Sequence, residues 1–206
     1  MLVTELSASG KTKCKVYLDY EYAFMLSNRE AKRYKIEVNQ EISDDVYAEI
    51  MNELILPKAK LKAMDLLKSM DRTEMELMNK LRLSGFADSV CQYALDYVKK
   101  FNYINDYRYA CNYINYRKSN KSLKMLQLEL SRKGVDKQLI HQAVEEEYHY
   151  GMEEEAVRLE LKKKCRNLEE LTYEKRMKLS ASLYRKGYSP SVIRKVLGDL
   201  ELYDET

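Results

Sequence analysis

The side chains that could carry out catalysis or bind a metal are few and widely spaced. The two histidines, His141 and His149, lie eight residues apart, not at the four-residue spacing that puts two zinc ligands on one helix face. No Cys-x-x-Cys pair occurs, and there is no GxSxG motif and no phosphate-binding loop. The sequence therefore indicates a non-enzymatic protein with no metal site and no cofactor.

The remaining candidates for chemistry have structural interpretations. Two glutamate runs, Glu145–Glu147 and Glu153–Glu155, are expected on a solvated helix face or at a hinge, because paired carboxylates do acid–base work only inside a pocket. Cys91 is expected to be a core residue, and the unpaired cysteines indicate a reducing compartment. No apolar run is long enough for a membrane span or a signal peptide, so we expect a cytoplasmic protein.

Basic residues and tyrosines are concentrated in the middle of the chain. Residues 57–151 hold 17 basic and 12 acidic side chains, whereas residues 1–56 hold 7 and 10. Such a mixture could contact nucleic acid, since phosphates attract Lys and Arg and bases stack on aromatic rings. However, Tyr109 and Tyr113 stand one helical turn apart and are better interpreted as core residues, and a net charge of +3 is small for a dedicated DNA-binding protein.

The elements that must position these residues follow from an internal repeat around Gly85, Gly134 and Gly187, which lie 49 and 53 residues apart. Leucines stand four and eight residues before each glycine, on one helix face. An apolar residue directly follows each glycine. A second apolar stripe, typical of a helix, begins five residues after the glycine. Each copy therefore predicts a helix that ends at a glycine with positive φ, followed by another helix. Thr73 and Glu76 predict a capping box at the start of the first copy.

A third helix is expected before each copy, at about 57–69, 106–117 and 152–164. Each of those helices has its own apolar stripe, which in the last one includes Leu159. The second helices of the three copies are expected to be capped by Asp88, Asp136 and Ser189. Three-helix modules bury little surface alone, so neighbours should pack end to end into a curved, elongated, mainly α array. The expected modules are 57–104, 105–151 and 152–206.

The first 56 residues predict a small β-rich head with a linking helix. Lys13–Asp19 and Glu21–Ser27 are β-prone runs around a turn near Tyr20, and Leu2–Leu6 could add a strand. A short helix is expected at Asn28–Tyr34, and a last strand at Lys35–Val38. A helix capped by Ser43 should end near Leu54, and Pro57 should open the first module.

Several stretches resemble the RecX regulatory proteins of bacteria. The stretch RTEMELMNKLRLSGF (Arg72–Phe86) resembles that family's order of Arg, Ser or Thr, Glu-Leu, Lys-Leu and Gly. Asn105-Asp106 followed by Tyr109-Ala110 resembles the family's Asn-Asp and Phe-Ala pairs, which open its second module, and YRKSNKSLKMLQLELSRKGV (Tyr116–Val135) resembles the sequence that follows them. Within the last stretch the family often has a glycine where this chain has Lys121-Ser122. The head, with VYLDYEYAF (Val16–Phe24), is similar to longer members, so the resemblance covers nearly the whole chain.

This resemblance implies a regulator that binds the RecA recombinase filament on single-stranded DNA and modulates it, usually by inhibiting ATP hydrolysis, strand exchange and coprotease activity, in DNA repair and SOS control. We expect a monomer that lies in the filament groove and contacts DNA weakly. A basic face would complement the acidic filament and its phosphates. The expected binding residues are Arg72, Lys80, Arg82, Arg117, Lys118, Lys121, Lys124, Arg132, Lys133, Arg185, Lys186, Arg194 and Lys195.

Two other functions remain compatible with the sequence. One is a helical protein that binds single-stranded or duplex nucleic acid directly, which a salt-sensitive mobility shift with naked DNA would favour. The other is a protein–protein scaffold with no DNA role, which salt-insensitive binding to RecA without DNA would favour.

Overall fold

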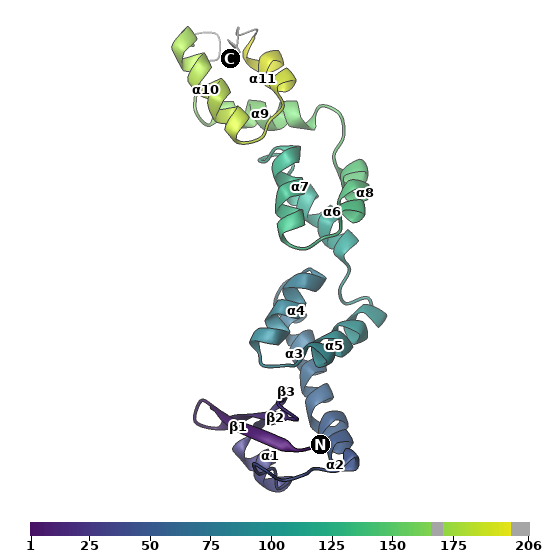
Figure 1. Cartoon of the computed structure of the whole chain (residues 1–206). Helices are drawn as coiled ribbons and strands as arrows, with labels where there is room; N and C mark the ends of the chain where they lie inside the picture. Colours follow the sequence, from purple (N-terminus) through teal and green to yellow (C-terminus); the bar gives the residue numbers. More distant parts are fainter. Residues whose placement is uncertain (166–170, 199–206) are drawn as a thin grey trace. The chain divides into compact units, whose positions relative to one another are not determined.

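The computed structural model describes residues 1–165 and 171–198, and the chain divides into two compact units, Met1–Asn105 and Asp106–Thr206. Figure 1 shows the elements of each unit. The first unit contains a small sheet and a group of helices, and the described part of the second is helical. Among the described residues, no helix is both long and apolar enough to span a membrane.

The head is an antiparallel sheet with the strand order β1-β2-β3. Its second and third strands alternate between buried and more exposed side chains, as a sheet with one buried face requires, and Val16 pairs with Phe24 across them. Asp19 and Tyr20 make the turn with φ of +49° and +71°, which suits the right-handed twist of a hairpin. Three of the expected strands and the short helix are confirmed as β1 (Val3–Ser9), β2 (Lys13–Leu18), β3 (Glu21–Ser27) and α1 (Asn28–Arg33).

The strand expected at Lys35–Val38 is absent, and the segment forms turns instead. Lys35 and Asn39 both have positive φ, at +51° and +66°, which interrupts an extended backbone at either end. The N–H of Ile36 donates to the carbonyl of Ala31, so Ile36 turns back onto α1 and is buried there. Ile36 is the one buried side chain of this segment, whereas Val38 is 48 % exposed.

The expected break before Pro57 is also wrong. Helix α2 (Asp44–Glu49) continues through a π-helical segment, η1 (Ile50–Ile55), into α3 (Leu56–Ser69), with helical backbone at both junctions. The N–H of Leu56 donates to the carbonyl of Met51, five residues back. This wider turn directly precedes the proline, which has no N–H to donate, and it lets the helix pass Pro57 without ending.

The repeat forms three groups of three helices, as expected. The first module comprises α3, α4 (Glu74–Leu83) and α5 (Asp88–Lys100). The second comprises α6 (Asp106–Arg117), α7 (Leu123–Arg132) and α8 (Lys137–Glu147). The third comprises α9 (Met152–Lys162), α10 (Tyr173–Arg185) and α11 (Pro190–Leu197).

Each middle helix ends in the same Schellman motif. Gly85, Gly134 and Gly187 have φ of +89°, +82° and +83°. The following apolar residue donates its N–H to the carbonyl five residues back: Phe86 to Leu81, Val135 to Leu130 and Tyr188 to Leu183. The capping box of Thr73 and Glu76 is confirmed at the start of α4.

Three apolar cores underlie these helices. One joins the head to the first module, and the second and third modules each have their own. The leucines four residues before each glycine are all buried, as is Cys91, whereas Leu159 is 40 % exposed and so was wrongly placed inside. Asp88 is not a cap: Ala87 precedes α5, and the carboxylate of Asp88 binds Arg82 instead. Asp136 caps α8 as expected.

Candidate functional site

Five of the thirteen cations expected to bind a partner are engaged in ion pairs within the protein. Side-chain exposures in these pairs range from 10 % to 73 %, so some lie at the open surface and others are half buried. The pairs are Arg82 with Asp88, Lys118 with Glu147, Lys121 with Glu129, Lys186 with Glu160 and Lys195 with Glu154. Their charges are largely compensated inside the protein.

Two further cations lie over a tyrosine stack on the second module. Tyr109 and Tyr113 stack with ring centroids 6.0 Å apart. The guanidinium of Arg117 lies 4.1 Å from the Tyr113 centroid, and the ammonium of Lys133 lies 5.6 and 5.9 Å from the two rings. Tyr113 is buried as expected, while Tyr109 is half-buried. These basic residues and tyrosines form one structural cluster.

Glu129 anchors the same cluster. It accepts hydrogen bonds from Lys121 and from the hydroxyl of Tyr113, the latter at 2.7 Å. Burial opposes its ionisation, but these bonds lower the pKa of Glu129 below its ordinary value. Burial, together with the bond to Glu129, raises the pKa of Tyr113 to about 12. Lys121 is therefore held as a counter-ion and is a weaker candidate for binding than the sequence indicated.

Arg72 also has a structural partner. Its Nε donates a 3.2 Å hydrogen bond to the carbonyl of Leu66, near the end of α3. This bond satisfies one of the helix's last carbonyls. The remaining five predicted cations are exposed and form no ion pair among the described residues: Lys80, Lys124, Arg132, Arg185 and Arg194.

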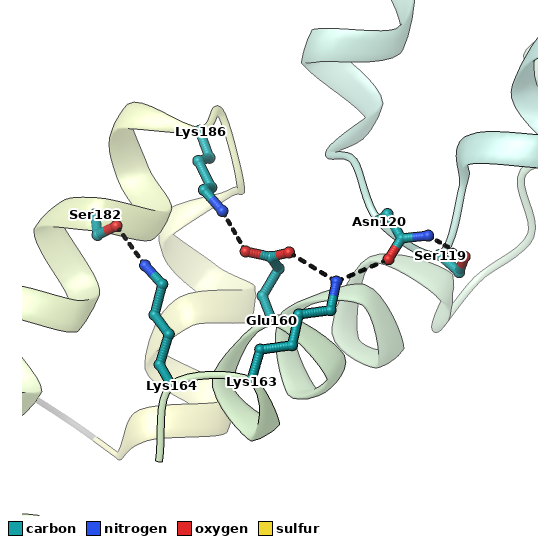
Figure 2. A network of polar contacts seen from close by, with 7 residues as sticks. All are labelled: Ser119, Asn120, Glu160, Lys163, Lys164, Ser182 and Lys186. Atoms are coloured by element: carbon teal, nitrogen blue, oxygen red, sulfur yellow. Dashed lines mark hydrogen bonds and ion pairs between the residues drawn. The ribbon is translucent and has the colours of Figure 1, made fainter.

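Residues that were not predicted connect the second module to the third. Glu160 of α9 is 8 % exposed and binds the ammonium groups of both Lys186 and Lys163. Lys163 also donates a 2.9 Å bond to the side-chain oxygen of Asn120, in the loop between α6 and α7. Figure 2 shows this chain of contacts running from Lys186 through Glu160 and Lys163 to Asn120.

Ser122 makes a second connection between these modules. Its hydroxyl oxygen accepts from the N–H of Met125, which caps α7, and its hydroxyl donates a 2.7 Å bond to the carbonyl of Lys186. A Cβ on Gly187 would come 2.9 Å from this hydroxyl, so the approach requires glycine for space as well as for φ. We call Asn120, Ser122, Glu160, Lys163 and Lys186 the inter-module cluster.

The third module also has a polar contact of its own, where the start of α11 meets the first turn of α9. Ser189 precedes α11 as expected, yet its side chain does not cap that helix. Instead its N–H and hydroxyl both donate to the carboxylate of Glu153, at 3.0 and 2.9 Å. An open groove of about 430 Å³ lies beside this contact, lined by residues that include Lys124, Tyr184 and Gly187. One of the uncompensated cations thus borders the junction of the two modules.

Possible metal ligands come together at one place in the described residues. The ligand atoms of Cys111, Glu146 and Glu147 lie within 4.8 Å of one another. The hydroxyl of Tyr107 donates to Glu146, and Lys118 pairs with Glu147, so both carboxylates already have positive or hydrogen-bonding partners. Both histidines are exposed. This cluster is accounted for without a metal ion.

The inter-module cluster was missed because its members share no spacing. A weak signal existed for Ser122, which stands directly before the apolar run of α7 where an N-cap is expected. Nothing in the sequence links Glu160 to Lys186, which lies 26 residues away. Their meeting depends on how α9 packs against α10 and its terminal turn.

The sequence matches three family models, one for each module. They are described as the first, second and third three-helix domains of RecX, and they match residues 59–97, 105–144 and 152–197. A protein named Regulatory protein RecX from Caldanaerobacter subterraneus is 31 % identical, and the alignment covers 96 % of this chain and 98 % of the relative. A protein of the same name from Clostridium beijerinckii is 28 % identical, with 96 % and 93 % covered.

Solved structures agree on the fold. A crystal structure of regulatory protein RecX matches with a TM-score of 0.65 at 21 % identity, over 96 % of this chain and 99 % of the other. A crystal structure of RecX from Lactobacillus salivarius matches with a TM-score of 0.61 at 26 % identity, over 69 % and 94 %. The expected mainly helical fold, with tandem three-helix repeats and a small sheet, is thereby confirmed.

Proposed function

The chain belongs to the RecX family of regulatory proteins, and from this we propose that it binds the RecA recombinase filament on single-stranded DNA. In this proposal it acts as a cytoplasmic monomer in DNA repair and SOS control. Binding bridges neighbouring RecA subunits and hinders the opening that nucleotide turnover and strand exchange require. The expected results are inhibition of ATP hydrolysis, of strand exchange and of coprotease activity.

The observation that carries the proposal is the inter-module cluster. It joins the second and third modules, which lie in one compact unit. Four cations of that unit that form no ion pair within the described part of the chain, Lys124, Arg132, Arg185 and Arg194, are therefore presented by one body. A long acidic partner with a repeating structure is a suitable ligand for charges spread over two joined modules.

The structure also revises which residues should be tested. Reversing Lys118 or Lys121 would leave Glu147 or Glu129 beside a second negative charge and would disturb folding. Lys124, Arg132 and Arg185 have no such partner among the described residues, so their reversal changes the surface charge alone. We assign the first contact with the filament to these three residues and to Arg194 and Lys80.

The test is ATP hydrolysis by RecA on single-stranded DNA with increasing amounts of this protein. We expect wild-type protein to inhibit, and the triple variant Lys124→Glu, Arg132→Glu, Arg185→Glu to require at least tenfold more protein for the same inhibition. A matched control reverses three exposed cations of the first unit, Lys11, Lys32 and Lys62. Equal inhibition by the triple variant and the wild type would refute the assignment of these residues.

Two further measurements separate the two alternative functions. Inhibition that depends on the amount of free DNA, and disappears when DNA is in excess, would favour direct nucleic-acid binding. Binding to RecA without DNA, unaffected by salt, would favour a scaffold.

A further inference from the structure

The second and third modules meet through polar contacts rather than through a shared core. Among the residues that the structure describes, the buried apolar side chains of these modules form two separate clusters. The hydroxyl of Ser122 donates to the carbonyl of Lys186 at 2.7 Å, and the ammonium of Lys163 donates to the side-chain oxygen of Asn120 at 2.9 Å (Figure 2). A hydrogen bond contributes little net free energy, because water can replace it when it breaks. We call these two bonds the latch.

The chain that connects these two modules is short and largely open to solvent. Helix α8 ends at Glu147 and α9 begins at Met152, so the connection is the segment 148–151. Its last three residues are exposed, and Tyr150 is fully so. Gly151 has φ of +93°, and a Cβ at this position would meet nothing within 4 Å. A few exposed residues between two helices can absorb the change in backbone angles that a hinge requires.

Two buried hydroxyl groups favour a second arrangement of this junction. Tyr148 packs against the core of the second module, and Tyr188 belongs to the core of the third. Both hydroxyls are buried, and neither has a hydrogen-bond partner within the described part of the chain. Burial, together with the charges of Glu153 and Tyr188, raises the pKa of Tyr148. Because an unpaired buried hydroxyl is costly, an arrangement that exposes these groups to water offsets part of the loss of the latch.

We propose that the segment 148–151 is a hinge, and that the second and third modules exchange between the closed, latched arrangement of the structure and an open one. Each module stays folded in both arrangements, because each has its own apolar core. In the closed arrangement the exposed cations of the two modules are presented together, and opening changes the spacing between Lys124 and Arg185. This effect on a partner rests on the function proposed above, whereas the hinge itself does not depend on RecA.

The experiment measures the distance between nitroxide labels on the two modules of the full chain, by double electron–electron resonance and without any partner. The labels are attached at Gln142→Cys in α8 and Lys178→Cys in α10, both at exposed positions. The half-buried cysteines, Cys14 and Cys165, are replaced by serine so that they are not labelled. We expect two populations of distances, of which the larger comes from the closed arrangement.

Breaking one bond of the latch from either side should shift these populations in the same way. Asn120→Ala and Lys163→Met should each raise the ratio of open to closed molecules about fivefold, as expected for one hydrogen bond. The double variant should raise this ratio no further, since both changes remove the same bond. Asn120→Ala also leaves the ion pair of Lys163 with Glu160 in place. Lys164→Met is the matched control, because the ammonium of Lys164 binds Ser182 within the third module, and it should leave the ratio unchanged.

Three results would overturn the proposal. One is a single distance that neither Asn120→Ala nor Lys163→Met changes. Another is an equal shift caused by Lys164→Met, which would mean that the loss of a positive charge, and not of the latch, moves the modules. The third is a loss of helical signal in the far-ultraviolet circular dichroism of Asn120→Ala, because a module that unfolds is not moving about a hinge.

Discussion

The hydroxyl of Ser122 donates a 2.7 Å hydrogen bond to the backbone carbonyl of Lys186, and so connects the start of α7 in the second module with the end of α10 in the third. The same oxygen accepts from the N–H of Met125. One buried side chain therefore satisfies a free donor at one helix end and a free acceptor at another. Because two helix ends depend on this one hydroxyl group, a single substitution at Ser122 should lower the stability of the junction between the two modules.

Replacing Ser122 by alanine should destabilise the protein more than the loss of an ordinary helix cap does. Loss of an N-cap costs about 1 kcal/mol, and the carbonyl of Lys186 would also lose its partner at a partly buried site, at a further ~1 kcal/mol. Ser43→Ala is the matched control, since Ser43 caps α2 through Val46 but is exposed and makes no bond to another module. Urea unfolding of both variants measures the difference, and equal losses would contradict the role assigned to Ser122.

Gly187→Ala should cost more than Gly10→Ala, although both glycines have positive φ. The strain of a Cβ in the left-handed region, roughly 1–2 kcal/mol, applies to both. A Cβ at Gly10 meets nothing within 4 Å, whereas at Gly187 it would lie 2.9 Å from the Ser122 hydroxyl. The additional loss should therefore appear in thermal melts of Gly187→Ala. It should shrink when Ser122 is already alanine, because the close contact is then gone; a fully additive double variant would argue against this explanation.

The parts of the fold that the sequence revealed are those set by local chemistry. A helix that must end with positive φ selects glycine, so Gly85, Gly134 and Gly187 marked the three helix ends correctly. The capping box of Thr73 and Glu76 was equally visible, because it needs only a three-residue spacing.

The errors arose where tertiary packing overrides local preference. Proline is commonest at the start of a helix, yet the π segment before Pro57 lets a longer helix continue through it. Asp88 is a good cap by residue type, but its carboxylate is taken by Arg82 at 2.8 Å. The least predictable feature was which of the expected binding cations form ion pairs within the protein. Whether a lysine such as Lys186 is free or paired depends on a partner 26 residues away.

Glu160 should make the stability of the protein depend on pH in the acid range. The hydrogen bond from Lys186, supported by that from Lys163, lowers the pKa of Glu160 below its ordinary value of 4.5, although burial opposes this. The unfolded chain then binds more protons at Glu160 than the folded one does, so its stabilisation is complete above pH 4.5. It is lost as the pH falls through the lower, folded-state pKa.

The variant Glu160→Gln lacks this titrating group, so its stability deficit relative to wild type should shrink between pH 6 and pH 3. Urea unfolding at a series of pH values measures that difference. Glu155→Gln, at an exposed carboxylate of the same helix, is the control and should give only a small deficit. A deficit for Glu160→Gln that stays constant down to pH 3 would show that the ion pairs with Lys186 and Lys163 contribute nothing to folding.

The four cysteines should react with iodoacetamide in two classes. Cys91 is fully buried, and this burial, with a smaller contribution from Asp88, raises its thiol pKa to about 11. Burial also raises the pKa of Cys111, which is 9 % exposed, and that of Cys14. Cys14 and Cys165 are only half-buried, however, so the reagent can reach them in the folded protein. Since the thiolate is the reactive form, intact-mass spectra at pH 8 should show two adducts forming first and two more only on unfolding. The double variant Cys14→Ser, Cys165→Ser should lack both of the adducts that form first. Modification of Cys91 in the folded protein at the rate of Cys165 would mean that the shared core of the head and first module opens readily.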